Sequence, residues 1–192
     1  MSTALRMTLL SLGALAATAV AYAQDTGDTG DVVYSGNIFL VDELNEITDG
    51  DYYCFDVWGD TVENPDGTQV HTCKNRRKPA EDQLWIIDSP NLGNITVELV
   101  DGLCVEASSV SAGSGLIVTT CSSSTNQLWY SDGDGEIHPA SNTNLCWTVA
   151  TTRMCGNPSC SNFKRTMTLE KCASAPDPKF IIWDIPGGTI GM

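Results

Sequence analysis

The triplet Gln83-Leu84-Trp85 occurs again, unchanged, as Gln127-Leu128-Trp129, 44 residues further along the chain. A third tryptophan follows 54 residues later, at the end of Phe180-Ile181-Ile182-Trp183. A recurring motif at such intervals indicates a chain built from copies of one supersecondary unit. We therefore interpret the sequence as three repeats.

The cysteines follow the same rhythm. Each repeat has one cysteine in a short apolar run and a second one 17 to 26 residues later. The third and longest interval contains Cys155-Gly156-Asn157-Pro158-Ser159-Cys160, which we interpret as an insertion closed by its own disulfide. Eight cysteines allow many pairings, and the repeat selects one set. The predicted bridges are Cys54–Cys73, Cys104–Cys121, Cys146–Cys172 and Cys155–Cys160.

Short runs of β-branched and aromatic residues alternate with turn signals throughout the chain. Examples are the runs 53–57 and 95–99 and the turn at Asp132-Gly133. Helical periodicity is not sustained anywhere. Four strands in each of three repeats predict an all-β fold of about twelve strands with intra-repeat disulfides. A propeller needs at least four blades, so three repeats that close on themselves favour a β-trefoil.

The first 23 residues have the pattern of a secretory signal peptide. Arg6 precedes an apolar run from Leu9 to Val20, and Ala21-Tyr22-Ala23 resembles a cleavage site. The sequence therefore predicts a secreted, extracellular protein, in which paired cysteines are expected. No later segment is long and apolar enough to predict membrane insertion. With two histidines and no Cys-x-x-Cys pair, we expect no metal and no cofactor.

The composition excludes some functions. The 192 residues include 24 Asp and Glu against 10 Lys and Arg, a formal net charge of −14 that disfavours nucleic-acid binding. Motifs of hydrolases and phosphate-binding enzymes are missing, so we expect no enzymatic activity. The domain organisation expected is a signal peptide (1–23), an acidic disordered leader (24–34), a trefoil domain (35–186) and a flexible tail (187–192). The repeats would span about 35–90, 91–135 and 136–186.

The cysteine pairs, the Gln-x-Trp triplets and the opening Cys54-Phe55-Asp56-Val57 together resemble the ricin B-type lectins, also called family 13 carbohydrate-binding modules. The resemblance covers about residues 35–186. It implies a β-trefoil in which each repeat is able to carry one shallow sugar site. It also implies glycans or glycoproteins as partners, with galactose or N-acetylgalactosamine as the commonest ligand type. Trp85, Trp129 and Trp183 would then be core residues.

The resemblance points to the first repeat as the sugar site. Asp56 matches the family's carboxylate and Gln69 its amide, while Asp82-Gln83 matches its closing pair. His71 takes the stacking position, where it offers a smaller surface than the usual Trp, Tyr or Phe.

The other two repeats match less well. Glu106 and Asn126-Gln127 form a weaker second site, because Thr119 cannot stack on a sugar. The third repeat has Thr148 and Glu170 at these positions, and we expect it not to bind. A single degenerate site predicts weak binding, since a millimolar contact corresponds to about 4 kcal/mol.

Two further features keep an alternative open. The basic run 74–78 is interpreted as a solvated loop, a contact for anionic sugars or a processing site. A trefoil with decayed sugar sites could instead act on a protein partner, for example as a protease inhibitor. The loops available for this are Thr61–Gly67, the basic run and the insertion. Asn94-Ile95-Thr96 is an N-glycosylation sequon.

Overall fold

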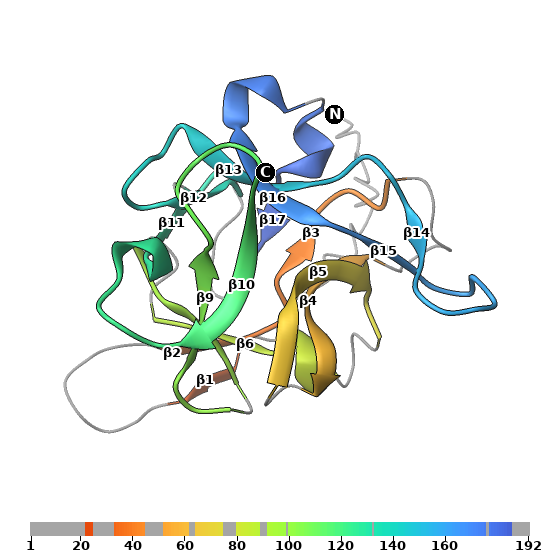
Figure 1. Cartoon of the computed structure of the whole chain (residues 1–192), viewed down its shortest axis with the longest axis horizontal. Coiled ribbons are helices and arrows are strands. Elements are labelled where there is room, and N and C mark those ends of the chain that lie inside the picture. Colours follow the sequence, from red (N-terminus) through yellow and green to blue (C-terminus); the bar gives the residue numbers. More distant parts are fainter. Residues whose placement is uncertain are drawn as a thin grey trace, which may run out of the picture.

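The computed structural model describes residues 22–24, 33–44, 52–61, 64–74, 80–88, 92–98, 100–131, 133–175 and 177–185. Its regular elements in these ranges are β-strands and short 3₁₀ turns (Figure 1). The all-β prediction is therefore confirmed. The runs of β-branched and aromatic residues between glycine- and asparagine-containing turns account for this, since such runs fit a pleated, half-buried surface.

The strands group into the three repeats expected from the sequence. The first contains β2 (Val33–Gly36), β3 (Phe39–Leu40), β4 (Tyr53–Thr61), β5 (Asn64–Thr72), η1 (Glu81–Gln83) and β6 (Trp85–Ile87). The second contains β7 (Leu92–Gly93), β8 (Ile95–Val97), β9 (Leu103–Ala107), β10 (Ser114–Thr120), η2 (Thr125–Gln127) and β11 (Trp129–Ser131). The third contains β12 (Ile137–Pro139), β13 (Leu145–Val149), β14 (Met154–Cys155), β15 (Phe163–Arg165), β16 (Met167–Lys171), η3 (Cys172–Ser174), η4 (Pro178–Phe180) and β17 (Trp183–Asp184).

Strand pairing closes the three repeats into a ring. The last strand of each repeat pairs with the first strand of the next: β6 with β8, β11 with β12, and β17 with β3. Inside each repeat the two middle strands form an antiparallel hairpin: β4 with β5, β9 with β10, and β13 with β16. This is the arrangement of a β-trefoil, and closing the ring protects the strand edges.

The strand count agrees with twelve once interrupted strands are joined. β2 and β3, β7 and β8, and β15 and β16 each occupy one strand position of the trefoil. β1 (Tyr22–Gln24) and β14 lie outside that scheme. β14 pairs with β15 and belongs to the insertion.

β1 lies where the predicted signal peptide meets the predicted leader. Tyr22–Gln24 pairs antiparallel with β2, with Gln24 opposite Val33. The two ends of the segment 24–34 are therefore strand, although the acidic composition predicts disorder for it. The pairing also uses Tyr22 and Ala23, which the predicted cleavage would remove. Residues 25–32, most of the predicted signal peptide and the tail 187–192 lie outside the described residues.

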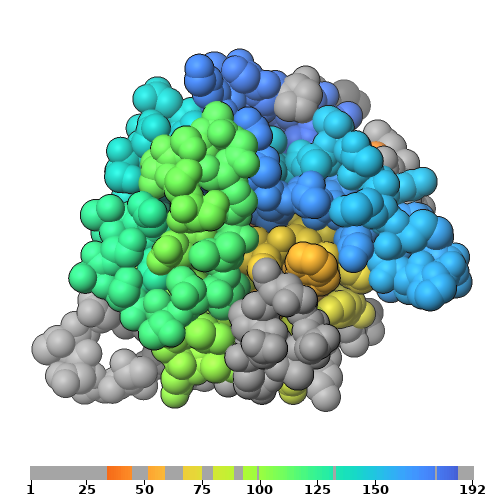
Figure 2. Space-filling view, viewed as in Figure 1, coloured from red at the N-terminus to blue at the C-terminus, as the bar shows by residue number. Residues whose placement is uncertain are grey.

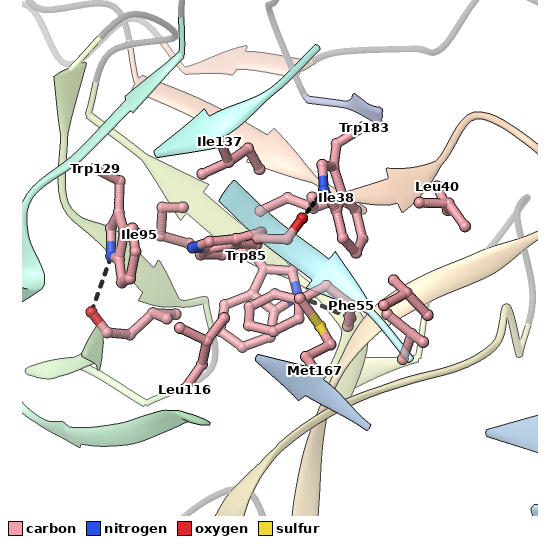
Figure 3. Packing of buried hydrophobic residues seen from close by; sticks show 14 of the residues in the cluster. Ile38, Leu40, Phe55, Trp85, Ile95, Leu116, Trp129, Ile137, Met167 and Trp183 are labelled. Atoms are coloured by element: carbon pink, nitrogen blue, oxygen red, sulfur yellow. Dashed lines mark hydrogen bonds between the residues drawn. The ribbon is translucent and has the colours of Figure 1, made fainter. Parts of the chain in front are cut away.

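Tryptophans of the repeated motif lie in the core. Trp85 and Trp183 are fully buried and Trp129 is 2% exposed. Each donates its indole N–H to the carbonyl of the residue that follows the first cysteine of its repeat (Figure 3). The acceptors are Phe55 at 3.0 Å, Val105 at 3.0 Å and Trp147 at 3.3 Å. The sequence prediction that these tryptophans are structural is confirmed.

Trp147 joins the repeats at the centre of the core. It is fully buried, and its ring centroid lies 4.6 Å from Phe55, 5.0 Å from Trp129 and 6.0 Å from Trp183. Edge-to-face and offset contacts at such distances are favourable beyond the area that they bury. One side chain of the third repeat therefore packs against aromatic residues from all three repeats.

All four predicted disulfides are present. The three long-range bridges close the hairpins within single repeats, with Cα–Cα distances of 5.0, 4.9 and 5.1 Å. The fourth, Cys155–Cys160, closes the insertion. None of the four joins two repeats, as the repeat pattern predicts.

The glutamines of the Gln-x-Trp triplets connect the two ends of each of the first two repeats. Gln83 and Gln127 are fully buried. The Oε1 atom of Gln83 accepts from the backbone N–H of Lys74 at 3.0 Å, and that of Gln127 accepts from Ser122 at 2.7 Å. Their Nε2 atoms donate to carboxylates, Asp56 at 2.9 Å and Glu106 at 2.7 Å. Both side chains therefore have the same structural role, which is to join a backbone N–H at the end of the hairpin to a carboxylate on its first strand.

We predict that Gln83→Ala and Gln127→Ala each lower the free energy of unfolding by about 2 kcal/mol, because each removes a fully buried side chain that pairs with both a backbone N–H and a carboxylate. Urea unfolding followed by circular dichroism measures the change. Thr125→Ala, an exposed position in the same turn as Gln127, is the control and should stay near wild type. Equal stability of either glutamine variant and wild type would contradict the structural role.

Candidate functional site

The β4–β5 hairpin brings together the first-repeat residues that the sequence selects. Asp56 lies opposite Gln69, and Cys54 lies opposite His71. Opposite residues of an antiparallel pair share one face of the sheet, so these side chains lie on the same face. The amide Nε2 of Gln69 donates to Oδ1 of Asp56 at 2.9 Å. The carboxylate and the amide that the family resemblance selects are therefore in direct contact.

Asp56 itself is not available at the surface. The residue is 1% exposed, and its other oxygen, Oδ2, accepts from Nε2 of Gln83 at 2.9 Å and lies 3.1 Å from Nζ of Lys74. Burial raises the pKa of Asp56 above its ordinary value of 3.8; the hydrogen bonds from Gln69 and Gln83 and the charge of Lys74 only partly oppose this. The carboxylate holds the surrounding side chains in place from beneath.

Lys74, the first residue of the basic run, is a site residue that the family resemblance does not assign. Its ammonium group lies between Asp56 and Asp82 and donates to Oδ2 of Asp82. Partial burial alone would lower the pKa of Lys74, but the hydrogen bond to Asp82 and the charge of Asp56 raise it above 10.5. The signal was local: Lys74 directly follows Cys73, where the second repeat has Ser122. The rest of the basic run, 75–78, lies outside the described residues.

His71 does not offer the stacking surface that the sequence predicts. Its ring is 7% exposed, and its Nδ1 atom is 2.9 Å from the carbonyl of Thr72, so the ring donates there when Nδ1 carries the proton. A Cβ atom added at Gly156 would lie only 2.6 Å from Nε2 of His71. The backbone of the insertion therefore lies against the imidazole, an approach that glycine permits.

The third repeat covers His71 through a strand pair. β15 continues the sheet beyond β5, with Lys164 opposite His71 and Arg165 opposite Val70. The Oγ1 atom of Thr72 donates to the carbonyl of Phe163 at 3.2 Å and accepts from its N–H at 2.9 Å. A segment about ninety residues away in sequence thus covers the His71 ring, so that the ring is not available to stack on a sugar.

Three partly exposed side chains remain over the buried carboxylate: Gln69, Lys74 and Asp82. We call them the first-repeat rim. Lys74 has a relative side-chain exposure of 37% and Asp82 of 29%. Together they present an amide, an ammonium group and a carboxylate, which can donate to and accept from hydroxyl groups.

The second repeat has the same scaffold without a rim of this kind. Glu106 is partly exposed and is held by Gln127, as described above, while Nδ2 of Asn126 donates to the carbonyl of Ala107 at 3.4 Å. Thr119 lies opposite Cys104, in the position equivalent to His71. The predicted second-site residues therefore lie together, but no aromatic side chain stands at the stacking position.

The third repeat lacks both the carboxylate and the motif glutamine, and Glu170, at the position equivalent to His71, is partly exposed. Thr148 is buried and donates to the carbonyl of Cys146 at 3.1 Å, and Ile181 is buried at the position of the motif glutamine.

One cluster of the third repeat has the residue types of a metal site. Ligand-type atoms of Glu136, His138, Cys146 and Cys172 lie within 4.8 Å of one another. The two sulfur atoms are joined in a disulfide, so they are not thiolate ligands here.

The sequon residue Asn94 lies between β7 and β8 and is half-buried. Its Nδ2 atom is 3.4 Å from Oδ2 of Asp88, to which it donates. Its glycosylation stays a prediction.

Among the described residues, no helix is long and apolar enough to cross a bilayer.

A family model described as ricin-type beta-trefoil lectin domain matches residues 43–161 and 91–180. No curated protein matches the chain significantly. Among solved structures, the agglutinin of Abrus precatorius is 17% identical with a TM-score of 0.55, over 83% of this chain. The match covers 48% of that agglutinin, so the chain spans about half its length.

Two smaller structures are covered almost completely. The C-terminal domain of an earthworm lectin, a mutant solved with 6'-sialyllactose, is 17% identical with a TM-score of 0.51, over 79% of this chain and 98% of that domain. The β-trefoil lectin of the Vibrio vulnificus hemolysin/cytolysin, solved with N-acetyl-D-lactosamine, is 16% identical with a TM-score of 0.50, over 83% and 98%. At these identities the likeness establishes the fold.

We predict that Lys74→Met makes stability depend more strongly on pH. A carboxyl whose pKa is raised on folding stabilises fully below about pH 3.8, and this contribution is lost as the pH rises through the raised value. Removing the ammonium group raises the pKa of Asp56 further, so the variant loses more stability than wild type between about pH 3.8 and neutral pH.

Urea unfolding across this pH range, together with carboxyl ¹³C shifts of Asp56, measures both effects. Lys179→Met is the control, because Lys179 lies 3.6 Å from Asp177, away from Asp56. Parallel stability curves for wild type and Lys74→Met, or an unchanged pKa of Asp56, would contradict the assigned ion pair.

Proposed function

Since this chain belongs to the ricin-type β-trefoil lectin family, we propose that it is a secreted, non-enzymatic carbohydrate-binding protein. Its ligands would be glycans of the galactose or N-acetylgalactosamine type, bound weakly at the first-repeat rim. Secretion is supported by the signal-like residues 1–23 and by four disulfides, which suit an oxidising compartment.

The observation that carries this proposal is the assembly of the rim. Gln69 is held by one oxygen of Asp56, while Lys74 is held between the other oxygen and Asp82. Fixing these groups before binding reduces the entropy lost on contact with a ligand. The first repeat alone has this combination, because Ser122 replaces lysine in the second repeat and Ile181 replaces the glutamine in the third.

The burial of His71 supports weak binding. Stacking on an aromatic ring would bury the apolar face of a sugar, and His71 cannot supply it while Gly156 lies against its ring. Hydrogen bonds to exposed groups contribute little against water. A single such contact fits a millimolar dissociation constant, about 4 kcal/mol.

We predict that Asp82→Ala weakens binding of N-acetylgalactosamine glycans about tenfold, while Asp82→Asn keeps binding because an amide still offers an acceptor. A glycan array of the chain, followed by calorimetric titration, measures this. Asp101→Ala, at an exposed aspartate of the second repeat, is the matched control. Failure of wild type to bind any glycan, or full binding by Asp82→Ala, would refute the proposal.

One observation favours a second candidate, action on a protein partner through the insertion. Cys155 and residues 158–160 are exposed, and the β14–β15 hairpin projects at one edge of the molecule (Figure 1). The disulfide is supported by bonds from Nδ2 of Asn157 to Oγ of Ser161 at 2.7 Å and from the N–H of Ser161 to Oδ1 of Asn157 at 3.0 Å. A preorganised loop of this kind suits a protease inhibitor. Tight protease inhibition that disappears when 156–159 is replaced by Gly-Ser, with a silent glycan array, would select this function.

A further inference from the structure

One of the five tryptophans is not part of the core. Trp58, near the end of β4, is 50% exposed, while the other four are at most 2% exposed. Tryptophan is usually highly buried, and where it is exposed its large rigid ring is well suited to contact a ligand. Trp58 belongs neither to the repeated Gln-x-Trp motif nor to the positions at which the family resemblance places the sugar site.

Trp58 lies on the same face of the hairpin as the proposed site. Residues alternate between the two faces of a strand, so Asp56 and Trp58 point to one side. Gly67 stands opposite Trp58, and Gln69 stands opposite Asp56. Because Gly67 has no side chain, nothing on the partner strand covers the indole from that position. The strand register shifts directly after Trp58, and such irregularities reorient neighbouring side chains.

The third repeat adds a positive charge at this indole. Nζ of Lys164, on β15, lies 5.7 Å from the centroid of the Trp58 ring. Lys164 stands opposite His71, which places it on the face shared with Gln69 and Trp58. In Figure 2 the described atoms of the first repeat (orange and yellow) reach the surface in a hollow between the second repeat (green) and the third (blue).

The strand pair that buries His71 is therefore also the one that delivers Lys164 to Trp58. The stacking surface is removed at His71 on β5 and supplied again by Trp58 on the neighbouring strand β4. The new surface differs in charge, because an ammonium group now lies over the ring. The formal net charge of the chain is −14, which disfavours anionic ligands in general. A positive group at Trp58 therefore makes this place on the surface different from its surroundings.

Building on the proposed carbohydrate-binding function, we propose that Trp58 and Lys164 form the contact surface for an anionic saccharide. The apolar face of the sugar ring would stack on the indole, and a carboxylate or sulfate on the sugar would pair with the ammonium group. Gln69 would complete the contact from the first-repeat rim.

The charge of the ligand follows from the position of Lys164. A neutral sugar that stacks on Trp58 must displace the ammonium group from the ring and offers nothing in return for the lost cation–π contact. An acidic sugar keeps Lys164 as its partner, because the ammonium group can move from the ring to the anion. The surface therefore selects acidic over neutral sugars.

The test compares methyl galacturonide with methyl galactoside, which differ only in a carboxylate at C6. Binding is followed by the change in tryptophan fluorescence on adding sugar, which we assign to Trp58 because the other four tryptophans are buried away from the ligand. We expect wild type to bind the galacturonide about two- to fivefold more tightly, with the preference shrinking at high salt. Lys164→Gln should remove the preference, and Trp58→Ala should weaken binding of both sugars, measured by calorimetry.

Two controls match these variants. Lys179→Gln removes another lysine that lies over an aromatic ring, 5.4 Å from the centroid of Phe180, and Val41→Ala truncates another exposed apolar residue, 40% exposed. Both should bind both sugars as wild type does. Circular dichroism confirms that each variant is folded.

The outcomes separate the two proposals. If wild type binds both sugars equally, or if Trp58→Ala and Lys164→Gln behave like their controls while Asp82→Ala loses binding, the surface is wrong and the first-repeat site stands. If wild type binds neither these sugars nor any glycan on the array, the carbohydrate-binding function fails and this inference fails with it.

Discussion

Three buried hydrogen bonds organise this molecule: the indole N–H of Trp85, Trp129 and Trp183 each donates to the carbonyl after the first cysteine of its own repeat. Each bond fixes the last strand of a repeat to its second strand inside the core. The disulfide of the repeat links this second strand to the residue at the end of the hairpin. An indole N–H left unpaired in the core would cost free energy, so the position of each tryptophan specifies the backbone that it meets.

This constraint separates structural residues from residues that can recognise a ligand. The second residue after the first cysteine lies on the strand that the tryptophan fixes. In the first two repeats this residue is Asp56 or Glu106, and its carboxylate accepts a hydrogen bond from the buried motif glutamine. Asp56 is therefore sealed beneath its neighbours. Differences between repeats then decide function. Lys74, Trp58 and the insertion have no counterparts in the second repeat, and all three lie at or beside the first-repeat hairpin.

Features that recur with the repeat could be predicted from the sequence, because the same spacing appears more than once. The disulfide pairing and the buried tryptophans are of this kind. The burial of His71 could not be predicted, because it depends on β15 and Gly156 of another repeat. The same strand pair determines what lies over Trp58. Long-range pairing of an insertion leaves no periodic signal in the sequence.

The most direct test of this account is hydrogen exchange of the five tryptophan indole N–H groups, followed by NMR on ¹⁵N-labelled protein. The account predicts that the indoles of Trp85, Trp129 and Trp183 exchange only on global unfolding and that Trp58 exchanges rapidly, since only Trp58 is exposed. Rapid exchange at any of the three motif tryptophans, or protection of Trp58 as strong as theirs, would contradict it.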